Sequence, residues 1–325
     1  MNQKTYCPEL WRSISIDNKG NVFSCCLNKP LKFGNINDTT LVNIINDDSI
    51  VACREQSLKG LLSCHDGCTW VRAEETNGEK DSVRIGYDEL EIITIAFGEA
   101  CNISCIMCKQ RKRIIPNDVI LKSNTLIENL DISPFKKIFL TGGEPLLMNE
   151  CVEYMEHLAS IGKKFGFSTN GMLLTDGLIE FLAPNLDFIT FSLNAATEET
   201  HEMVNVGSTY AKVLGNIKKL RDVREAKGYD FTIIGRMTLT VPALHEIPAF
   251  IVDHKNLGFD RINFSFDKAT VLPYLVDNPD FADELKNRIS CALREVKCRQ
   301  DIDIHRLRLL NLVNEDVPFD GWWEL

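Results

Sequence analysis

Strands and helices alternate through the middle of this chain, and this alternation limits the fold more than any other feature. Helical patterns occur at 150–163, 210–227 and 244–256. Apolar, β-branched or aromatic runs typical of strands occur at 91–97, 136–140, 165–168, up to 191–194, 231–240 and 261–266. Right-handed crossovers join such strands into one parallel sheet, and six units curve into a partial barrel. The sequence therefore predicts an α/β fold.

Three cysteines follow the first of these strands in the segment Cys101-Asn-Ile-Ser-Cys105-Ile-Met-Cys108. A loop of this length can place three thiolates around one corner of a four-iron cluster, and no fourth cysteine follows within the next few residues. One iron would then lack a protein ligand and could be chelated by a small molecule, as at the open position of a catalytic zinc. A zinc site completed by a His or a distant Cys is the alternative, because thiolates suit both metals.

A second motif ends the next strand, where 136–140 runs into Thr141-Gly142-Gly143-Glu144-Pro145. Paired glycines let the backbone approach a ligand closely, and the carboxylate after them can receive an ammonium group. The two motifs lie about one strand–helix unit apart. Together they resemble the radical S-adenosylmethionine (radical SAM) enzymes.

The resemblance implies how the two motifs would be used. In that family the three cysteines hold a reducible 4Fe–4S cluster, SAM chelates its open iron, and the Gly-Gly-Glu strand end binds the methionyl amine. Met107 stands where the family usually has an aromatic residue beside the adenine, and its soft, apolar side chain can pack there. The resemblance also implies a partial (β/α)6 TIM-like barrel, in which chemistry occurs at the carboxyl ends of the strands.

Polar residues lie at or near several of these strand ends. By family position, Thr169, Asn170 and Ser192 would reach the ribose or carboxylate of SAM. Arg236 would reach the carboxylate. The alternative is that each of these residues only terminates a strand. No residue is assigned as hydrogen donor or general base.

The first eighty or so residues carry another set of cysteines. The pattern begins with Cys7 and, after twelve intervening residues, Gly20. It continues with Cys25 and Cys26, a Gly-Asn-Ile turn, and finally Cys64 and Cys68. It resembles the SPASM or shorter twitch auxiliary-cluster module, although that module commonly follows the barrel. The resemblance implies a second 4Fe–4S cluster, which Cys7, Cys25, Cys64 and Cys68 would close completely. Cys26 and Cys53 are alternative ligands or core thiols, and a zinc ribbon is the rival for the module.

These patterns divide the chain of 325 residues into three expected parts. They are an auxiliary iron–sulfur domain at 1–84, a radical SAM partial barrel at 85–300, and a tail at 301–325 that packs on or caps the barrel. The chain has no apolar run long enough to span a membrane and no signal-peptide core, so a cytoplasmic protein is expected. A net charge of −10 argues against a general nucleic-acid binder.

Two further groups of residues, a basic run and a set of cysteines, have weaker interpretations. Lys109, Arg111, Lys112 and Arg113 either line an entrance for an anionic substrate or form a solvated loop. Cys151, Cys291 and Cys298 could quench a radical by hydrogen donation, but core packing is the simpler role. The last two are seven residues apart, on one face of an expected helix, which suits burial.

The resemblance implies the first half of a mechanism. An electron from a flavodoxin- or ferredoxin-type donor enters the cluster, SAM is cleaved to a 5'-deoxyadenosyl radical, and that radical takes a hydrogen from the substrate. A peptide or protein side chain is the expected substrate, with oxidation, crosslinking or epimerisation as the outcome. A small molecule such as an aminocyclitol or sugar is the alternative. An iron–sulfur electron-transfer protein is the non-enzyme alternative, but it does not explain the Gly-Gly-Glu strand end.

Overall fold

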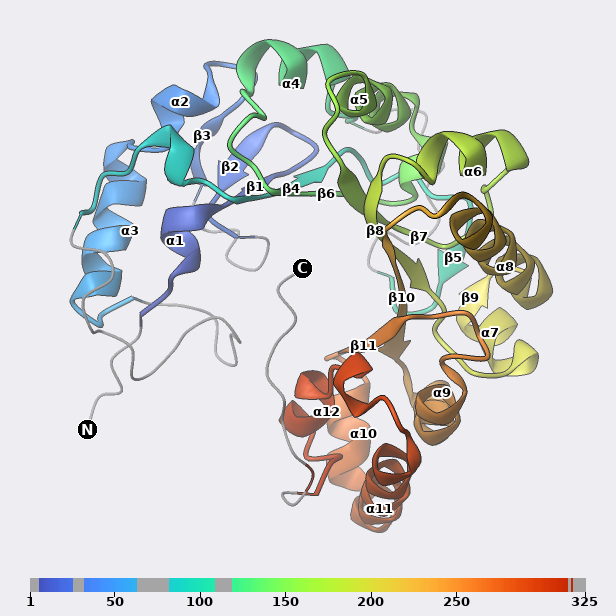
Figure 1. The fold of residues 1–325 in the computed structure, drawn as a ribbon. Helices are drawn as coiled ribbons and strands as arrows, with labels where there is room; N and C mark the ends of the chain where they lie inside the picture. Colours follow the sequence, from blue (N-terminus) through green and yellow to red (C-terminus); the bar gives the residue numbers. More distant parts are fainter. Residues whose placement is uncertain (1–5, 26–31, 63–81, 109–118, 315–316, 318–325) are drawn as a thin grey trace. The chain divides into compact units, whose positions relative to one another are not determined.

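The computed structural model describes residues 6–25, 32–62, 82–108, 119–314 and 317 (Figure 1). The chain forms two compact units, which are described one at a time. The first unit comprises Met1–Ala100 and Ile115–Phe165, and the second comprises Cys101–Ile114 and Gly166–Leu325.

The first unit is built on a sheet with the strand order β6-β4-β1-β2-β3. Its strands are β1 (Ser13–Ile16), β2 (Asn21–Phe23), β3 (Lys32–Asn35), β4 (Ile92–Ala96) and β6 (Lys137–Thr141). Its helices are α1 (Glu9–Arg12), α2 (Leu41–Ile44), α3 (Asp48–Leu58), α4 (Ser123–Asn129) and α5 (Asn149–Ser160), with 3-10 turns η1 (Tyr87–Glu89) and η2 (Pro145–Leu147). Burial alternates along β4, where Ile93 and Ile95 are buried and their neighbours are half-buried. This period of two is that of a strand with one face toward a core.

The cysteine-rich N-terminal segment shares this sheet with the first strand of the expected barrel. β1 pairs in parallel with β4, from Ser13 opposite Ile92 to Ile16 opposite Ile95, and β4 pairs in parallel with β6. β1 turns back into β2 through a hairpin in which the Asp17 carboxylate accepts hydrogen bonds from the backbone N–H of Lys19 and Asn21. The N-terminal segment is therefore joined to β4 by a strand ladder.

The second unit contains the strands in the order β7-β8-β10-β11. They are β7 (Phe165–Thr169, which starts at the last residue of the first unit), β8 (Leu186–Ser192), β10 (Thr232–Leu239) and β11 (Arg261–Phe266). β8, β10 and β11 run parallel. A separate two-residue ladder joins β5 (Ser104–Cys105) and β9 (Asn205–Val206).

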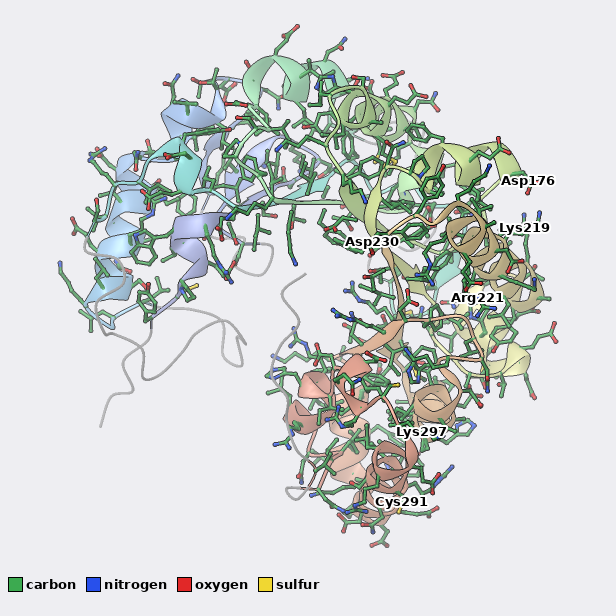
Figure 2. The ribbon with its side chains drawn as sticks, in the orientation of Figure 1. Asp176, Lys219, Arg221, Asp230, Cys291 and Lys297 are labelled. Carbon is green, nitrogen blue, oxygen red and sulfur yellow. The ribbon has the colours of Figure 1, made fainter. Side chains whose placement is uncertain are left out.

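Helices connect and follow the strands of the second unit (Figure 1). They are α6 (Asp176–Leu182), α7 (Glu198–Val204), α8 (Tyr210–Lys227), α9 (Ile247–Asp253), α10 (Val271–Asp277), α11 (Pro279–Glu295) and α12 (His305–Leu309), with 3-10 turns η3 (Val241–Glu246) and η4 (Arg299–Asp301). Lys219 of α8 and Asp176 of α6 form an exposed ion pair at 2.8 Å (Figure 2). The strands and helices alternate as the sequence predicts, and the α/β class with parallel strands, consistent with a partial TIM-like barrel, is confirmed.

Two helix predictions need correction. The helix expected at 244–256 is split into η3 and α9, and α9 has Pro248 in its first turn, where a missing N–H costs least. The helix expected to carry both Cys291 and Cys298 ends at Glu295, because Val296 adopts an extended conformation. Cys291 is exposed (Figure 2) and Cys298 is half-buried, so the burial predicted for this pair is wrong.

Cys151 does pack in the core, on α5. Among the described residues, no helix is both long and apolar enough to cross a membrane. The division at residues 84 and 300 remains a prediction.

Candidate cluster and cofactor site

The three cysteines of the CxxxCxxC motif lie in one tight loop of the second unit. Cys105 ends β5, and the backbone N–H of Cys108 donates to the carbonyl of Cys105 at 3.1 Å. All three thiols are half-buried, so they are neither sealed in a core nor fully in solvent. In the parts of the chain that the structure describes, no three His, Cys, Asp or Glu side chains already converge as metal ligands.

The environment of the Cys105 thiol perturbs its pKa. Burial first, and the neighbouring Cys101 and Cys108 thiols next, raise its pKa to about 12. Adjacent thiolates repel one another, and the positive charge of a bound metal ion offsets that repulsion, so that the coordinating thiols can be deprotonated. The donor set is thus three soft sulfur atoms on one loop, which fits one corner of an iron–sulfur cluster.

Asn170, just after β7, contacts this loop directly. Its side-chain Nδ2 donates to Asn102 Oδ1 at 2.8 Å and lies 3.7 Å from Cys101 Sγ, within the reach of a hydrogen bond to sulfur. Its Oδ1 accepts the backbone N–H of Met172 at 2.9 Å. Asn170 was expected at a SAM contact from its strand-end position. The structure adds a contact with the cysteine loop, in which the neighbouring Asn102 was not anticipated.

The β5–β9 ladder holds the other side of the cysteine loop. Cys105 is opposite Asn205 in the ladder, and the backbone N–H of Ile106 donates to the carbonyl of Val204 at 2.9 Å. A pairing of two residues leaves no periodic signal in the sequence, which explains why it was not predicted.

A buried chain of hydrogen bonds fixes Asn205. Thr238 N–H donates to Asn194 Oδ1, and Asn194 Nδ2 donates to Asn205 Oδ1, both at 2.8 Å. Asn205 Nδ2 therefore faces His201 Nδ1 at 3.0 Å, and His201 Nε2 is left to donate to Ser208 Oγ at 3.0 Å. His201 is fully buried, and this burial lowers its pKa to about 4. The direction of the chain requires a neutral imidazole.

The Gly-Gly-Glu turn belongs to the first unit and follows β6. Gly143 N–H donates to the Gly98 carbonyl at 2.9 Å, and Glu144 N–H donates to the Ala100 carbonyl at 2.8 Å. A Cβ on Gly143 would lie 2.1 Å from the Ala100 carbonyl oxygen, so only glycine fits. Gly142 has φ +150°, a conformation that side chains rarely adopt. The turn therefore contacts, and is hydrogen-bonded to, the backbone of the three residues that precede Cys101 in the chain.

Glu144 is completely buried at the start of η2. One carboxylate oxygen accepts the Leu146 N–H at 3.3 Å. The pKa of the neighbouring Cys151 thiol is raised, mainly by the burial of that thiol and secondly by the charge of Glu144. A carboxylate that is shielded from solvent makes strong hydrogen bonds to a cationic partner.

The other predicted SAM contacts on strands lie at or near the carboxyl ends of those strands, with Arg236 three residues before the end of β10. Ser192 ends β8, and Arg236 of β10 is directly opposite it in the parallel ladder. The Arg236 guanidinium donates through Nε to Asn263 Oδ1 of β11 at 2.8 Å. Thr169 is buried, and its hydroxyl accepts the Gly171 N–H at 3.0 Å, so part of its role is to close the turn after β7. Met107 is half-buried within the cysteine loop.

The expected auxiliary ligands are only partly described. Cys7 is buried, and its backbone N–H donates a hydrogen bond to Ser57 Oγ at 2.9 Å. Cys25 is half-buried. Cys53 is buried on α3 one turn before Ser57, and burial raises its thiol pKa. Cys26, Cys64, Cys68 and the basic run from Lys109 to Arg113 lie outside the described residues, as do residues 315–316 and 318–325 of the expected capping tail.

A buried arginine that the sequence did not point to organises this N-terminal region. Arg54, the residue after Cys53, donates to the carbonyls of Leu10 at 2.8 Å, Ile45 at 3.0 Å and Val83 at 3.1 Å. Burial lowers its pKa to about 10. One guanidinium thus ties together three segments that are distant in sequence.

Family comparisons agree with this assignment of motifs. Residues 95–239 match the Radical SAM superfamily, and residues 7–69 match SPASM, an iron-sulfur cluster-binding domain. Residues 95–239 form a radical SAM domain. The radical SAM match contains all three loop cysteines and the Gly-Gly-Glu turn. The SPASM match precedes it, so the unusual order expected from the sequence is confirmed, and the two domains imply 4Fe–4S clusters and SAM as cofactors.

The named relatives align with only part of this chain. A probable GTP 3',8-cyclase from Saccharolobus islandicus is 31% identical over 180 residues, which are 54% of this chain and 56% of that protein. A GTP 3',8-cyclase from Listeria welshimeri is 25% identical over 140 residues, 41% of this chain and 42% of the other. The chain therefore spans about half the length of the curated relatives it matches. Streptococcus suis SuiB bound to precursor peptide SuiA aligns with TM-score 0.47 and 15% identity, over 71% of this chain and 53% of SuiB.

Proposed function

We propose that this chain is an enzyme that cleaves SAM reductively and abstracts hydrogen from a substrate. The observation that carries the proposal is the half-buried loop of Cys101, Cys105 and Cys108 in the radical SAM domain. A three-thiol loop leaves one iron of a cubic cluster without a protein ligand. When bound, the reduced cluster supplies the electron that splits SAM into methionine and a 5'-deoxyadenosyl radical.

The protein's own groups bind and orient SAM in this proposal. Glu144 receives the methionyl ammonium, and the dry surroundings of its carboxylate strengthen that charge-assisted hydrogen bond. Gly142 and Gly143 let the backbone approach the methionyl group without a side chain in the way. Arg236 within β10 and Ser192 at the end of β8, which are opposite each other in the ladder, hold the SAM carboxylate and ribose.

The SPASM domain would hold a second cluster, which would supply the acceptor for an electron from the substrate radical. Cys7, Cys25, Cys64 and Cys68 are the proposed ligands, and complete ligation by four thiolates suits electron transfer rather than substrate binding. The net reaction is then an oxidation. A flavodoxin- or ferredoxin-type protein supplies the first electron.

The proposed substrate is a peptide or protein side chain. The SPASM match at residues 7–69 supports this choice, because the enzymes that the sequence resembles in this module include ones that modify ribosomally made peptides. A purine nucleotide is the second candidate, favoured by the 31% identity to a probable GTP 3',8-cyclase. Direct incubation with GTP, with mass spectrometry of the products, separates the two candidates.

The cofactor assignment is tested by metal analysis and electron paramagnetic resonance on anaerobically reconstituted protein. The parent should hold about eight irons, and a variant with Cys101, Cys105 and Cys108 all changed to Ala should hold about four. SAM should perturb the spectrum of the parent and yield 5'-deoxyadenosine, and the variant should do neither. Cys291→Ala is the matched control, because this thiol is exposed on α11, and it should behave as the parent.

Two results would contradict the proposal. A parent protein without a SAM-sensitive signal would remove the enzyme assignment. Zinc in the N-terminal domain, with four irons elsewhere, would remove the electron-acceptor role and leave redox-neutral chemistry.

A further inference from the structure

The Asn170 amide is oriented without ambiguity. The backbone N–H of Met172 can only donate, so the Asn170 atom that it contacts at 2.9 Å must be the carbonyl oxygen. The NH2 group is therefore the end that faces Asn102 Oδ1 and Cys101 Sγ. Asn170 is only 7% exposed, and both contacts are part-buried.

We propose that Asn170 is a positioning residue that donates a hydrogen bond to the Cys101 sulfur and raises the reduction potential of the cluster held by the CxxxCxxC loop. This inference rests on the proposed function, because it takes Cys101 as a cluster ligand. It assigns the Asn170 side chain to the cluster rather than to SAM. Asn102 has a supporting role, since its Oδ1 holds the first N–H and aims the second at the sulfur.

The direction of the effect follows from charge. Reduction adds one electron to the cluster and its thiolates, and a donated N–H stabilises the more negative state more strongly. The contact is part-buried, and electrostatic interactions there are less screened than in water. Without the N–H, the reduced cluster loses more stabilisation than the oxidised cluster. The potential should therefore fall when the donor is removed.

Two substitutions separate the donor from the rest of the side chain. Asn170→Leu has a similar shape and neither donates nor accepts. Asn170→Asp keeps an oxygen for Met172 N–H but places a carboxylate beside the Cys101 sulfur, which opposes added negative charge. Both should lower the potential, and the Asp variant should lower it further.

A neighbouring asparagine provides a control for disturbance of the same turn. Asn216 of α8 is also buried, and its Nδ2 donates to the carbonyl of Gly171 at 2.8 Å. Asn216→Leu therefore loosens the turn that carries Asn170 and leaves the amide–sulfur contact in place. It should lower the thermal stability without moving the potential.

The measurement is an anaerobic redox titration, followed by electron paramagnetic resonance, of parent and variants after their iron content has been checked. Asn170→Leu should reduce the ratio of reduced to oxidised cluster about tenfold at the parent's midpoint, which corresponds to about 59 mV for a one-electron couple. The SPASM cluster in the same samples is an internal reference, and its potential should stay constant. The dissociation constant for SAM should change little.

Each other outcome counts against the inference. An unchanged potential in both Asn170 variants, or an equal shift in Asn216→Leu, would overturn it. Weaker SAM binding at an unchanged potential would return Asn170 to a SAM contact. If the parent and Asn216→Leu take up the cluster but neither Asn170 variant does, Asn170 is needed for assembly and the tuning role is wrong. A parent that lacks a SAM-sensitive cluster would instead refute the proposed function itself.

Discussion

At the scale of single residues, the turn after β6 shows how little space the backbone leaves beside the cysteine motif. Gly143 is enclosed by the carbonyls of Glu99 and Ala100, and neither is the flexible end of a side chain. A methyl group there can be accommodated only by moving the backbone that leads into Cys101. The same residue thus fixes the turn and the start of the cysteine loop.

The substitution Gly143→Ala should therefore cost about 1–3 kcal/mol of stability and reduce loading of the loop cluster. Urea unfolding and iron content of the reconstituted protein measure the two effects. Gly215→Ala is the matched control: Gly215 lies within α8 with nothing inside 4 Å of an added Cβ, so alanine should be neutral or stabilising by about 1 kcal/mol. Normal stability and normal iron content in Gly143→Ala would show that the turn is softer than its contacts indicate.

At the scale of elements, β9 reaches the cysteine loop only because buried polar groups hold it there. Asn205 pairs with Cys105 through the backbone, and its side chain continues the hydrogen-bond chain to His201 and Ser208. Protonation of His201 Nδ1 would point a donor at the Asn205 NH2 group. Acid should therefore weaken the support of the loop.

The sign of the pH effect follows from the lowered pKa. An unfolded histidine titrates near 6.5 and folded His201 near 4, so between these values the unfolded chain binds a proton that the folded chain does not. Stability should fall as the pH drops through this window. From pH 7.5 to 5.5 the loss from this residue is about 1.3 kcal/mol.

Anaerobic urea unfolding of the parent and of His201→Gln at both pH values measures this loss. The Gln variant should lose less stability than the parent by that amount, because its amide does not titrate. His254 and His305, whose pKa values are also lowered by burial, are present in both proteins and cancel in the comparison. Equal losses in the two proteins would mean that the pKa of His201 is the same in the folded and the unfolded chain.

The elements also show what a sequence can and cannot reveal. Strands such as β4 and helices such as α8 were predictable, because the spacing of apolar residues along the sequence indicates which side chains are buried. The cysteine and Gly-Gly-Glu motifs are equally local. The β5–β9 ladder and the Asn170–Cys101 contact join residues about 70 to 100 positions apart through single side chains or residue pairs. No local pattern specifies such partners, and Asn170 could only be placed at a strand end.

At the scale of the whole molecule, the N-terminal domain was expected as a separate module, and its strand partner could not be predicted. β1 could have paired within its own domain alone, but it also pairs with β4, the strand that leads to the cysteine loop. Arg54 reinforces this connection, since it binds the carbonyl of Val83 in the segment between the two matched families. The SPASM and radical SAM segments thus share a sheet.

A shared sheet predicts that the radical SAM segment depends on the N-terminal domain for folding as well as for any electron transfer. Deleting residues 1–84 would leave the β4 edge unpaired and remove the buried side chains of Ile14, Ile16 and Val22. Each such side chain contributes about 1.5–3 kcal/mol, and their sum is comparable with the stability of about 5–15 kcal/mol of a typical domain. The truncated protein should aggregate.

The matched control keeps the strand and removes the metal ligands: Cys7, Cys25, Cys64 and Cys68 are all changed to Ala. This variant should remain soluble and keep about four irons with a SAM-perturbed spectrum. Soluble yield, circular dichroism and iron content distinguish the two proteins. A soluble truncation that still binds about four irons would show that the β1–β4 ladder is dispensable. Aggregation of both proteins would instead make the second cluster, rather than the strand, the feature on which folding depends.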